Sequence, residues 1–207
     1  IQSYVDIILD GYTGGINEQT AAIMQKIKIR CDLLSSSIKE MLELANLKSY
    51  INQAQNHHVK CQLEAIIKEV IGSYQVLAQE KNIHLSTSFA CDCPDIVCQI
   101  EQIKILLSVL IDNAIKYTPG GKRIDVETAV INNKVVLKVK DQGIGIKPEY
   151  FNKVFQEYFR SNRATDFNPN GTGLGLAIAK EIVNLHDYKI EIESTVDQGT
   201  TFSVTMS

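Results

Sequence analysis

The sequence predicts an α+β fold in which N-terminal helices precede a two-layer α/β sandwich. Two observations support this fold class. Apolar residues between positions 17 and 47 recur every three or four residues, as they do along one face of a long helix. Beyond residue 58, segments with helical periodicity come in mixed order with pairs of alternating strands joined by short turns. This order is typical of a sandwich rather than of a chain of obligatory crossovers.

Residues 1–50 are expected to form a helical hairpin. A short apolar segment, 3–9, ends at the turn signal Gly11, and a long helix then runs from the N-cap residue Asn17 to about Leu47. A single amphipathic helix with a short companion cannot bury its apolar seam alone. The simplest partner is a second copy of the chain, which would give a homodimeric four-helix bundle through the N-terminal helices. Packing onto the C-terminal half is the alternative.

Residues 58–207 are expected to form the second domain, after a polar linker at 48–58. Helices are expected near 63–78 and at 99–117, and the second is apolar almost all round and therefore buried. A further helix after Asp141, a polar stretch and a glycine-rich helix follow. The expected strands are 83–89, two strands around Asn132 that end at Asp141, and the pair 188–194 and 200–205.

Composition excludes some classes of function. The 207 residues are 44% hydrophobic and 22% charged, which is ordinary for a soluble globular protein. A net charge of −3 without a basic stripe argues against nucleic acid as a partner. No apolar run is as long as a membrane span and no secretory leader is present, so a cytoplasmic location is expected, with any membrane segment outside these residues.

The five cysteines, an odd number, fit a reducing compartment better than a disulfide framework. Three of them, Cys91, Cys93 and Cys98, lie close together in the sequence. Their spacing is not that of a common zinc site. Small residues in and around a loop are the favoured interpretation, and a metal site or an oxidation sensor is the alternative.

Three segments of the C-terminal half carry candidate binding residues, and the first is the apolar helix at 99–117. Asp112, Asn113 and Lys116 share one of its faces. Polar groups on so apolar a helix are costly unless they meet partners. One Asn oxygen suits Mg²⁺, which prefers few protein oxygens plus water and phosphate, and a Lys can reach phosphate as a point charge. A face that merely touches water is the alternative.

The second segment is the loop Asp-Gln-Gly-Ile-Gly-Ile, which follows a strand at Asp141. A buried carboxylate accepts hydrogen bonds from the amine of adenine, whereas guanine presents an acceptor there and would leave the carboxylate unpaired. Gly143 and Gly145 let the backbone turn tightly against a ligand. An ordinary surface turn is the alternative.

The third segment, Gly171 to Gly175, opens a helix, and the exposed amides at a helix N-terminus attract phosphate. It is neither a Walker loop nor a Rossmann fingerprint, because no Gly-Lys-Ser/Thr follows and the third glycine comes one position early. The polar stretch 162–170 before it has the composition of a mobile lid.

Taken in order, these segments resemble the ATP-binding domain of sensor histidine kinases, and the resemblance covers essentially the whole chain. IDNAIKYT at 111–118 resembles the asparagine box of that family, DQGIGI at 141–146 the first glycine box, and VFQEYFR at 154–160 the phenylalanine box. GTGLGLAIAKEIVNLH at 171–186 is similar to the second glycine box and GTTF at 199–202 to the last. The N-terminal helices resemble the dimerisation and phosphotransfer module.

The resemblance implies a set of site residues and two cofactors, ATP and Mg²⁺. Asn113 stands at the position of the magnesium ligand, Asn113 and Lys116 stand at the catalytic positions, and Asp141 stands at the adenine-reading position. The remaining residues implied to bind the nucleotide are Tyr117, Gly143, Gly145, Ile146, Phe155, Arg160, Gly171, Thr172, Gly173, Leu174, Gly175, Leu176 and Thr200.

The sequence departs from the family pattern at two main places. No His is followed by an acidic residue and Thr/Asn-Pro, so these residues lack the phosphoacceptor box and the hairpin at 1–50 is a partial one. Val109 stands where the family usually has the first Asn of its box, which takes away the second polar contact expected at the metal.

The resemblance therefore implies the catalytic portion of a sensor histidine kinase in two-component signalling. Such a domain binds Mg-ATP, and the γ-phosphoryl passes to a histidine and then to an aspartate on the receiver domain of a response regulator. Because the phosphoacceptor is absent from these residues, the chain is expected not to phosphorylate itself. Two alternatives are a conformational ATPase of the same superfamily and a non-catalytic dimerising or redox-sensing module.

Overall fold

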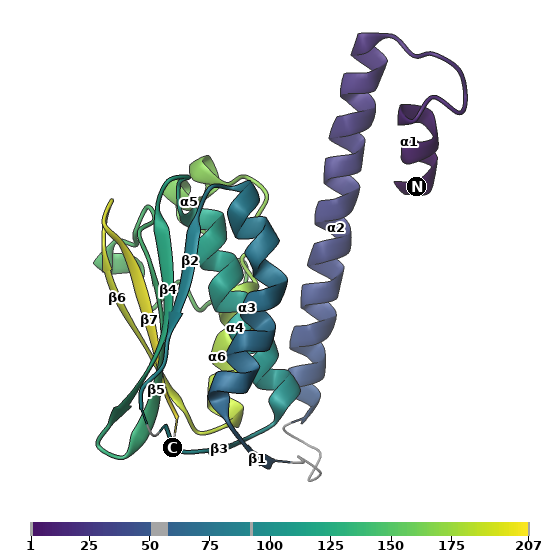
Figure 1. The fold of residues 1–207 in the computed structure, drawn as a ribbon. Helices are drawn as coiled ribbons and strands as arrows, with labels where there is room; N and C mark the ends of the chain where they lie inside the picture. Colours follow the sequence, from purple (N-terminus) through teal and green to yellow (C-terminus); the bar gives the residue numbers. More distant parts are fainter. Residues whose placement is uncertain (1, 51–57, 92, 207) are drawn as a thin grey trace.

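The structure, a computed structural model, describes residues 2–50, 58–91 and 93–206. At the N-terminus a short helix, α1 (Gln2–Leu9), lies beside a much longer one, α2 (Glu18–Tyr50). The two pack against each other, and α2 extends well beyond the remaining helices (Figure 1). The predicted pair of N-terminal helices is therefore present.

The start of α2 follows the sequence prediction. The Asn17 side chain caps the helix, because its Oδ1 accepts a hydrogen bond from the Thr20 amide at 2.8 Å. An ion pair of 2.5 Å between Asp6 and Lys28 joins α1 to α2. The helix continues to Tyr50, so the first residues of the expected polar linker are helical.

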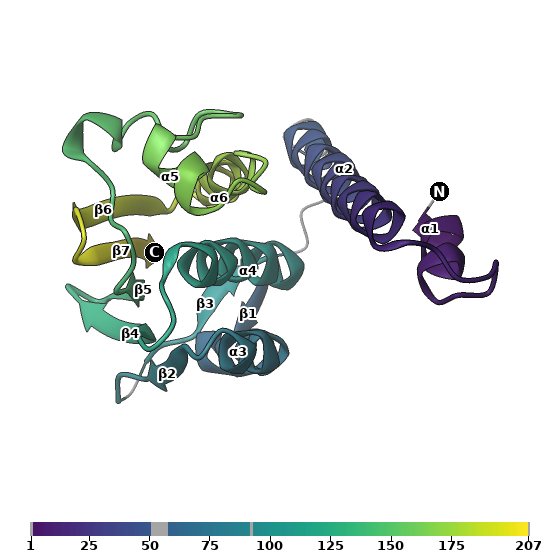
Figure 2. The same ribbon diagram turned by 90° about the horizontal axis from the view of Figure 1, so that it is seen from above.

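The C-terminal part is a two-layer sandwich, as predicted (Figure 2). Its sheet has the order β2-β4-β5-β7-β6, in which β2 and β4 are parallel and the other neighbours are antiparallel. One crossover, through a helix, is therefore needed between β2 and β4. The strands are β2 (His84–Ser88), β4 (Arg123–Ile131), β5 (Lys134–Asp141), β6 (Lys189–Thr195) and β7 (Gly199–Met206).

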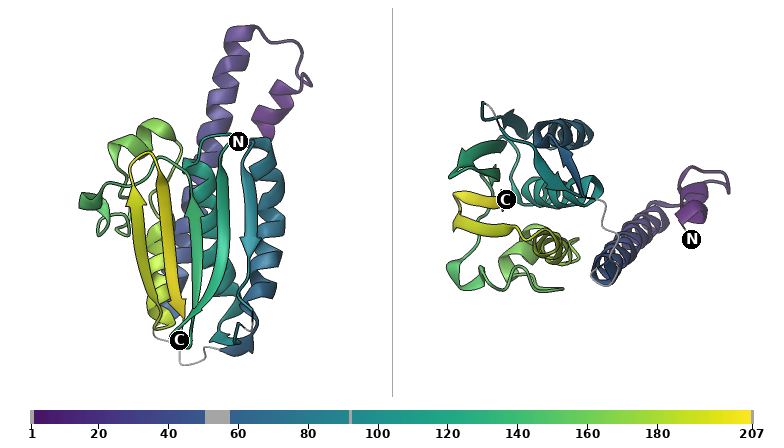
Figure 3. Two further views of the ribbon diagram at one scale, coloured as in Figure 1. Left: turned by 60° about the vertical axis from the view of Figure 1, so that its left-hand side comes forward. Right: turned by 90° about the horizontal axis from the view of Figure 1, so that it is seen from below.

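Three helices cover one face of this sheet and leave the other open (Figures 2 and 3). They are α3 (Leu63–Glu80), α4 (Ile100–Tyr117) and α6 (Gly175–Leu185). α4 lies between the other two, and Leu106, Leu107, Leu110 and Ile111 on it are completely buried. This burial fixes α4 in place, and with it the polar residues near its C-terminal end.

Some elements were not predicted correctly. Two three-residue strands, β1 (Val59–Cys61) and β3 (Ile96–Cys98), form a small antiparallel sheet where a linker end and a loop were expected. The helix expected after the Asp141 loop is only a 3₁₀ turn, η1 (Pro148–Tyr150), and the polar stretch contains a short helix, α5 (Asn162–Phe167). Strands of three residues are too short for an alternating pattern to indicate them.

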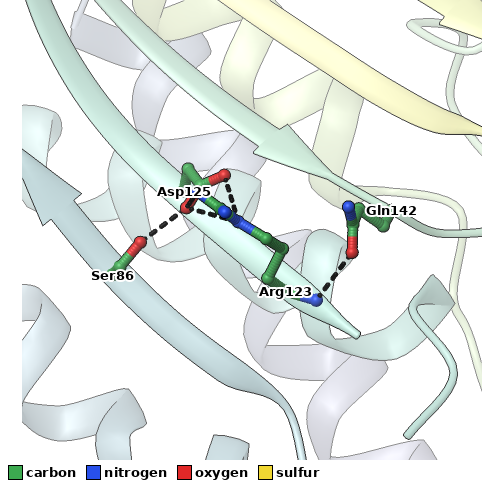
Figure 4. A network of polar contacts seen from close by, with 4 residues as sticks. All are labelled: Ser86, Arg123, Asp125 and Gln142. Carbon is green, nitrogen blue, oxygen red and sulfur yellow. Dashed lines mark hydrogen bonds and ion pairs between the residues drawn. The ribbon is translucent and has the colours of Figure 1, made fainter. Parts of the chain in front are cut away.

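The open face of the sheet carries a polar network that reaches toward the Asp141 loop (Figure 4). Asp125 accepts hydrogen bonds from Ser86 Oγ at 2.5 Å and from Arg123 Nη2 at 2.8 Å. Burial favours a higher pKa for Asp125, but these hydrogen bonds outweigh it and lower the pKa. The Arg123 amide in turn donates to Gln142 Oε1 at 3.2 Å. The network joins β2 to β4 and holds the residue that follows Asp141.

The apolar seam of α2 is largely uncovered. Ile23, Leu34, Ile38 and Met41 are each about half exposed or more. α2 also packs against α6, so part of the alternative prediction, contact with the C-terminal half, is correct. The exposed seam leaves room for a second copy, and the homodimer stays a prediction. None of the helices in the described ranges is long and apolar enough to cross a membrane.

Candidate functional site

One cavity of about 460 Å³ lies where α4, the loop after β5 and the start of α6 meet. This volume is within the range of cavities that hold small molecules and cofactors. The predicted site residues that line it are Asn113, Lys116, Tyr117, Asp141, Gly145, Ile146, Arg160, Gly171, Thr172, Gly173, Gly175, Leu176 and Thr200. The three segments singled out in the sequence therefore form walls of a single pocket.

Three predicted site residues lie behind the cavity wall rather than on it. Gly143 sits in the loop that carries Asp141, and Leu174 is buried beneath the start of α6. The Phe155 ring packs edge-on against Phe202, with the ring centroids 6.5 Å apart. These three residues support the pocket from the core side.

Asp141 forms the polar floor at one end of the cavity. Its side chain is buried, and Oδ1 accepts hydrogen bonds from the amides of Gly143 at 2.7 Å and Thr200 at 3.2 Å. Burial raises the pKa of Asp141 to about 6, although these two amides act to lower it. A carboxylate held in this way has fixed orientation and retains lone pairs that can accept from a ligand.

The loop after Asp141 approaches neighbouring backbone too closely for side chains. A Cβ on Gly143 would lie 2.4 Å from the carbonyl oxygen of Tyr117, and one on Gly145 would lie 2.2 Å from that of Thr195. Gly145 also has a φ of +67°, which L side chains rarely adopt. The Ile144 amide donates to the Tyr117 carbonyl at 3.1 Å. The loop is thus fastened to the C-terminal end of α4.

The predicted polar face of α4 lines the middle of the cavity. Lys116 forms an ion pair with Asp112, Nζ to Oδ2, at 2.6 Å. Burial acts to lower the pKa of Lys116, but the Asp112 carboxylate outweighs it and raises the pKa. The buried Nδ2 atom of Asn113 has no hydrogen-bond partner within the described part of the chain. A buried donor without a partner is costly, which makes Asn113 a candidate ligand-binding residue.

The glycine-rich segment forms the other end of the cavity, at the N-terminus of α6. A Cβ on Gly175 would make only ordinary contact with Val109, at 3.4 Å. The Arg160 guanidinium holds the preceding stretch, because it donates to the carbonyls of Gly171 at 3.0 Å and Pro169 at 3.1 Å. Ser161 caps α5 by accepting from the Ala164 amide. The stretch 162–170 predicted as a lid is thus tied to the pocket wall at several points.

Several residues of this wall were not predicted from the sequence, and Glu40 is the one that brings a charge from a distant helix. Glu40 on α2 lines the cavity, and its carboxylate accepts a hydrogen bond from the hydroxyl of Thr172. Glu40 also contributes to the raised pKa of Lys116. No sequence signal marks it, because its position depends on how α2 packs against α6.

Sequence comparisons identify the family of the chain. Residues 98–207, more than half of the chain, match the family described as histidine kinase-, DNA gyrase B- and HSP90-like ATPase. The histidine protein kinase SaeS of Staphylococcus epidermidis is 29% identical over 210 residues, which cover all of this chain and 58% of that protein. The signal transduction histidine-protein kinase ArlS of Staphylococcus aureus is 28% identical over 193 residues, 89% of this chain and 41% of ArlS. The chain thus spans about half the length of these relatives.

Solved structures share the fold. The Acinetobacter baumannii histidine kinase AdeS aligns over 100% of this chain and 92% of its own, with a TM-score of 0.71 and 20% identity. The histidine kinase ThkA, in complex with the response regulator protein TrrA, aligns over 99% of this chain and 58% of its own, with a TM-score of 0.73 and 21% identity. The chain belongs to the histidine kinase-, DNA gyrase B- and HSP90-like ATPase family, and its ATP-binding domain is of the sensor histidine kinase type.

Proposed function

We propose that this chain is the catalytic portion of a sensor histidine kinase, which binds Mg-ATP for transfer of the γ-phosphoryl to a histidine and then to an aspartate of a response regulator. One observation carries the proposal. The buried acceptor Asp141 and the Asn113 side chain, whose Nδ2 atom has no partner in the described chain, line the same cavity, which ends at the N-terminus of α6. We assign these three features as the adenine acceptor, the side chain whose oxygen would ligate the metal, and the phosphate site.

Each end of the ligand has a proposed partner. Asp141 accepts from the exocyclic amine of adenine, and the amides between Gly171 and Gly175 donate to the phosphates at the positive end of the helix. Asn113 holds magnesium through its side-chain oxygen, and Lys116 reaches a phosphate as a point charge. Magnesium, when bound, would neutralise part of the negative charge of the phosphates. The protein's own contribution is largely positioning.

The residues present suit Mg²⁺. A single neutral amide oxygen beside a phosphate site matches the preference of that ion for few protein ligands. Because Val109 replaces a second amide on the same face and lies against Gly175, Asn113 is the one metal ligand that we assign.

The first experiment is calorimetry of the chain with ATP, with and without Mg²⁺. We expect binding that Mg²⁺ strengthens and that GTP does not reproduce, because Asp141 would meet the guanine oxygen. Absence of ATP binding would overturn the proposal and would favour a vestigial pocket in a dimerising or redox-sensing module.

The second experiment separates phosphotransfer from hydrolysis. With γ-labelled ATP we expect no stable label on this chain, because it has no phosphoacceptor box. A chain extended upstream to such a box should take up the label and pass it to a receiver domain. Steady hydrolysis without any phosphoprotein would instead indicate a conformational ATPase.

The proposal also covers the oligomeric state, the protein partner and the location of the domain. The exposed seam of α2 supports a homodimer formed by the N-terminal helices. The relative ThkA was solved with a response regulator, which supports a receiver domain as partner here. Since ATP is in the cytoplasm, we place the domain there, with residues 1–50 as the partial dimerisation module and 58–207 as the ATP-binding domain.

A further inference from the structure

Two cysteines far apart in the sequence meet in the small sheet of β1 and β3. Val59 pairs with Cys98, and Cys61 pairs with Ile96, in an antiparallel register. Cys61 and Cys98 therefore occupy diagonal positions on the same face. Their Sγ atoms are 3.1 Å apart and share a hydrogen bond. At this distance only a small movement separates two thiols from a bond between them.

The two thiols differ in access. Cys98 is completely buried, whereas Cys61 is partly exposed. Burial, together with the hydrogen bond to Cys61, raises the pKa of Cys98 to about 12. Cys98 therefore stays protonated at neutral pH, and Cys61 is the thiol that solvent reagents reach first.

The surroundings favour redox chemistry over metal binding. Burial raises the pKa of Tyr188, the thiols of Cys98 and Cys61 act in the same direction, and the Tyr188 hydroxyl donates to the Val97 carbonyl at 3.1 Å. The His186 ring is already in use, because Nε2 accepts from the Gln99 amide at 3.1 Å. In the ranges that the structure describes, no three His, Cys, Asp or Glu side chains are grouped to hold a metal ion.

The predicted cysteine cluster is not the one that the fold brings together. Cys98 has its partner in Cys61, whereas the Cys93 thiol interacts with Thr128, and Cys91 is exposed. We propose that Cys61 and Cys98 are a reversible oxidation site, at which a peroxide converts the two thiols into a disulfide.

The chemistry balances with hydrogen peroxide as the two-electron oxidant. The Cys61 sulfur attacks one peroxide oxygen, the O–O bond breaks, and Cys61 becomes a sulfenic acid while the hydroxide leaves with the thiol proton as water. The Cys98 sulfur then attacks the Cys61 sulfur, and the S–O bond breaks. The leaving hydroxide takes the Cys98 proton, so two thiols and one peroxide yield one disulfide and two waters.

The bond would join two functionally placed segments. β1 is where the described sandwich begins after α2, and β3 is separated by one residue from α4, which carries Asn113 and Lys116. Cross-linking them closes a loop that contains all of α3 and β2. The oxidised chain therefore keeps β1 fixed to the start of α4, and it should unfold at a higher temperature.

The test uses the wild-type chain, fully reduced and then treated with equimolar hydrogen peroxide. After blocking of free thiols under denaturing conditions, peptide mass spectrometry should find Cys61 linked to Cys98, with loss of two hydrogens. Dithiothreitol should reverse the change. Oxidation should raise the melting temperature by roughly 5–10 °C. Cross-links between other cysteines, or Cys61 that stops at sulfinic acid with Cys98 still free, would overturn the proposal.

Two variants sharpen the result. Cys61→Ser should abolish the cross-link and the rise in melting temperature and leave Cys98 unreactive toward peroxide. The double variant Cys91→Ser/Cys93→Ser is the matched control, and it should retain both effects. The peptide mass spectrometry of the wild-type chain alone shows whether Cys61 and Cys98 are linked, so the result does not depend on whether a variant folds. ATP binding by the reduced chain is a separate measurement, so failure here leaves the proposed function intact.

Discussion

The two ends of the nucleotide cavity are built in contrasting ways. At the Asp141 end the carboxylate Oδ1 already accepts from two backbone amides, and the loop is confined by backbone contacts at Gly143 and Gly145. From the middle of the cavity to its α6 end, the Asn113 Nδ2 atom has no partner in the described chain, and the Thr172 hydroxyl donates to the Glu40 carboxylate on α2. The first end is organised before the ligand arrives, whereas the second must exchange its contacts for those of the ligand.

The largest expected effect comes from filling the space behind the organised end. In Gly143→Ala the new methyl would lie 2.4 Å from the Tyr117 carbonyl oxygen and 2.7 Å from Asp141 Oδ1. Because both neighbours belong to the pocket, the loop must shift. We expect ATP affinity to fall by about 100-fold or more and the free energy of unfolding by roughly 1–3 kcal/mol. Calorimetry and urea denaturation measure the two quantities.

The matched control for this variant is Gly72→Ala on α3. A Cβ there meets nothing within 4 Å, so the substitution should stabilise the helix by roughly 0.5–1 kcal/mol and leave ATP binding unchanged. If Gly143→Ala bound ATP as the wild type does, the Asp141 end would be adaptable and the contrast between the two ends would be wrong.

The next effect separates binding from stability at Asp141. Asp141→Asn keeps an acceptor for the amides of Gly143 and Thr200 but offers the adenine amine a weaker one. We expect ATP affinity to fall about 10- to 100-fold. The ligand-free domain, by contrast, should become more stable at pH 7. Burial raises the pKa of Asp141 from the usual 3.8 to about 6, so ionising it in the folded state costs on the order of 3 kcal/mol.

The sign of the pH dependence follows from this raised pKa. Below about pH 4 the carboxyl is protonated in both folded and unfolded chains, and the cost is absent. Between about pH 4 and pH 6 the unfolded chain loses the Asp141 proton while the folded chain, with its raised pKa, keeps it, so wild type loses stability relative to Asp141→Asn across this window and little more above about pH 7. Urea denaturation at pH 5 and pH 7 checks this. A stability difference that did not grow with pH would show that Asp141 is well solvated.

Local patterns explain why much of the site could be predicted from the sequence. The spacing of Asn113 and Lys116 alone places them on one helix face. The glycines that follow Asp141 indicate tight turns in that loop. Such features depend on residues close together in the chain. The last two strands were predictable for the same reason, because residues along β6 and β7 alternate between more buried and more exposed positions.

Features that depend on distant packing could not be predicted. Glu40 reaches the cavity only because α2 packs against α6, and no pattern in α2 distinguishes it from other surface carboxylates. Cys61 and Cys98 meet because two three-residue strands pair, and strands that short show no periodicity. The helix expected after Asp141 does not form, because the chain makes only a 3₁₀ turn from Pro148 and Tyr158 has a φ of +63°, which is outside the right-handed helical region.

A smaller effect is expected at the unsatisfied end, from Asn113→Ala. If the Asn113 side chain ligates magnesium, the variant and the wild type should bind ATP with equal affinity in EDTA. In the presence of Mg²⁺ the variant should bind ATP about tenfold more weakly than the wild type. The ligand-free chain should change in stability by no more than roughly 1 kcal/mol, because the buried Nδ2 atom that is removed has no partner in the described chain. Calorimetry with and without Mg²⁺ decides. Equal weakening in both conditions would assign Asn113 to the nucleotide rather than to the metal.

The smallest expected effect tests whether α2 competes with the ligand. The carboxylate of Glu40 lines the same cavity as the proposed phosphate site, so bound ATP would meet a like charge there. Glu40→Gln keeps an acceptor for Thr172 and removes that charge, and ATP affinity should rise about two- to fivefold, less at high salt. Glu127→Gln, the same change on the open face of the sheet, is the control and should have no effect. If Glu40→Gln bound ATP more weakly, Glu40 would assist the ligand instead of opposing it, and both ends of the cavity would be organised in advance.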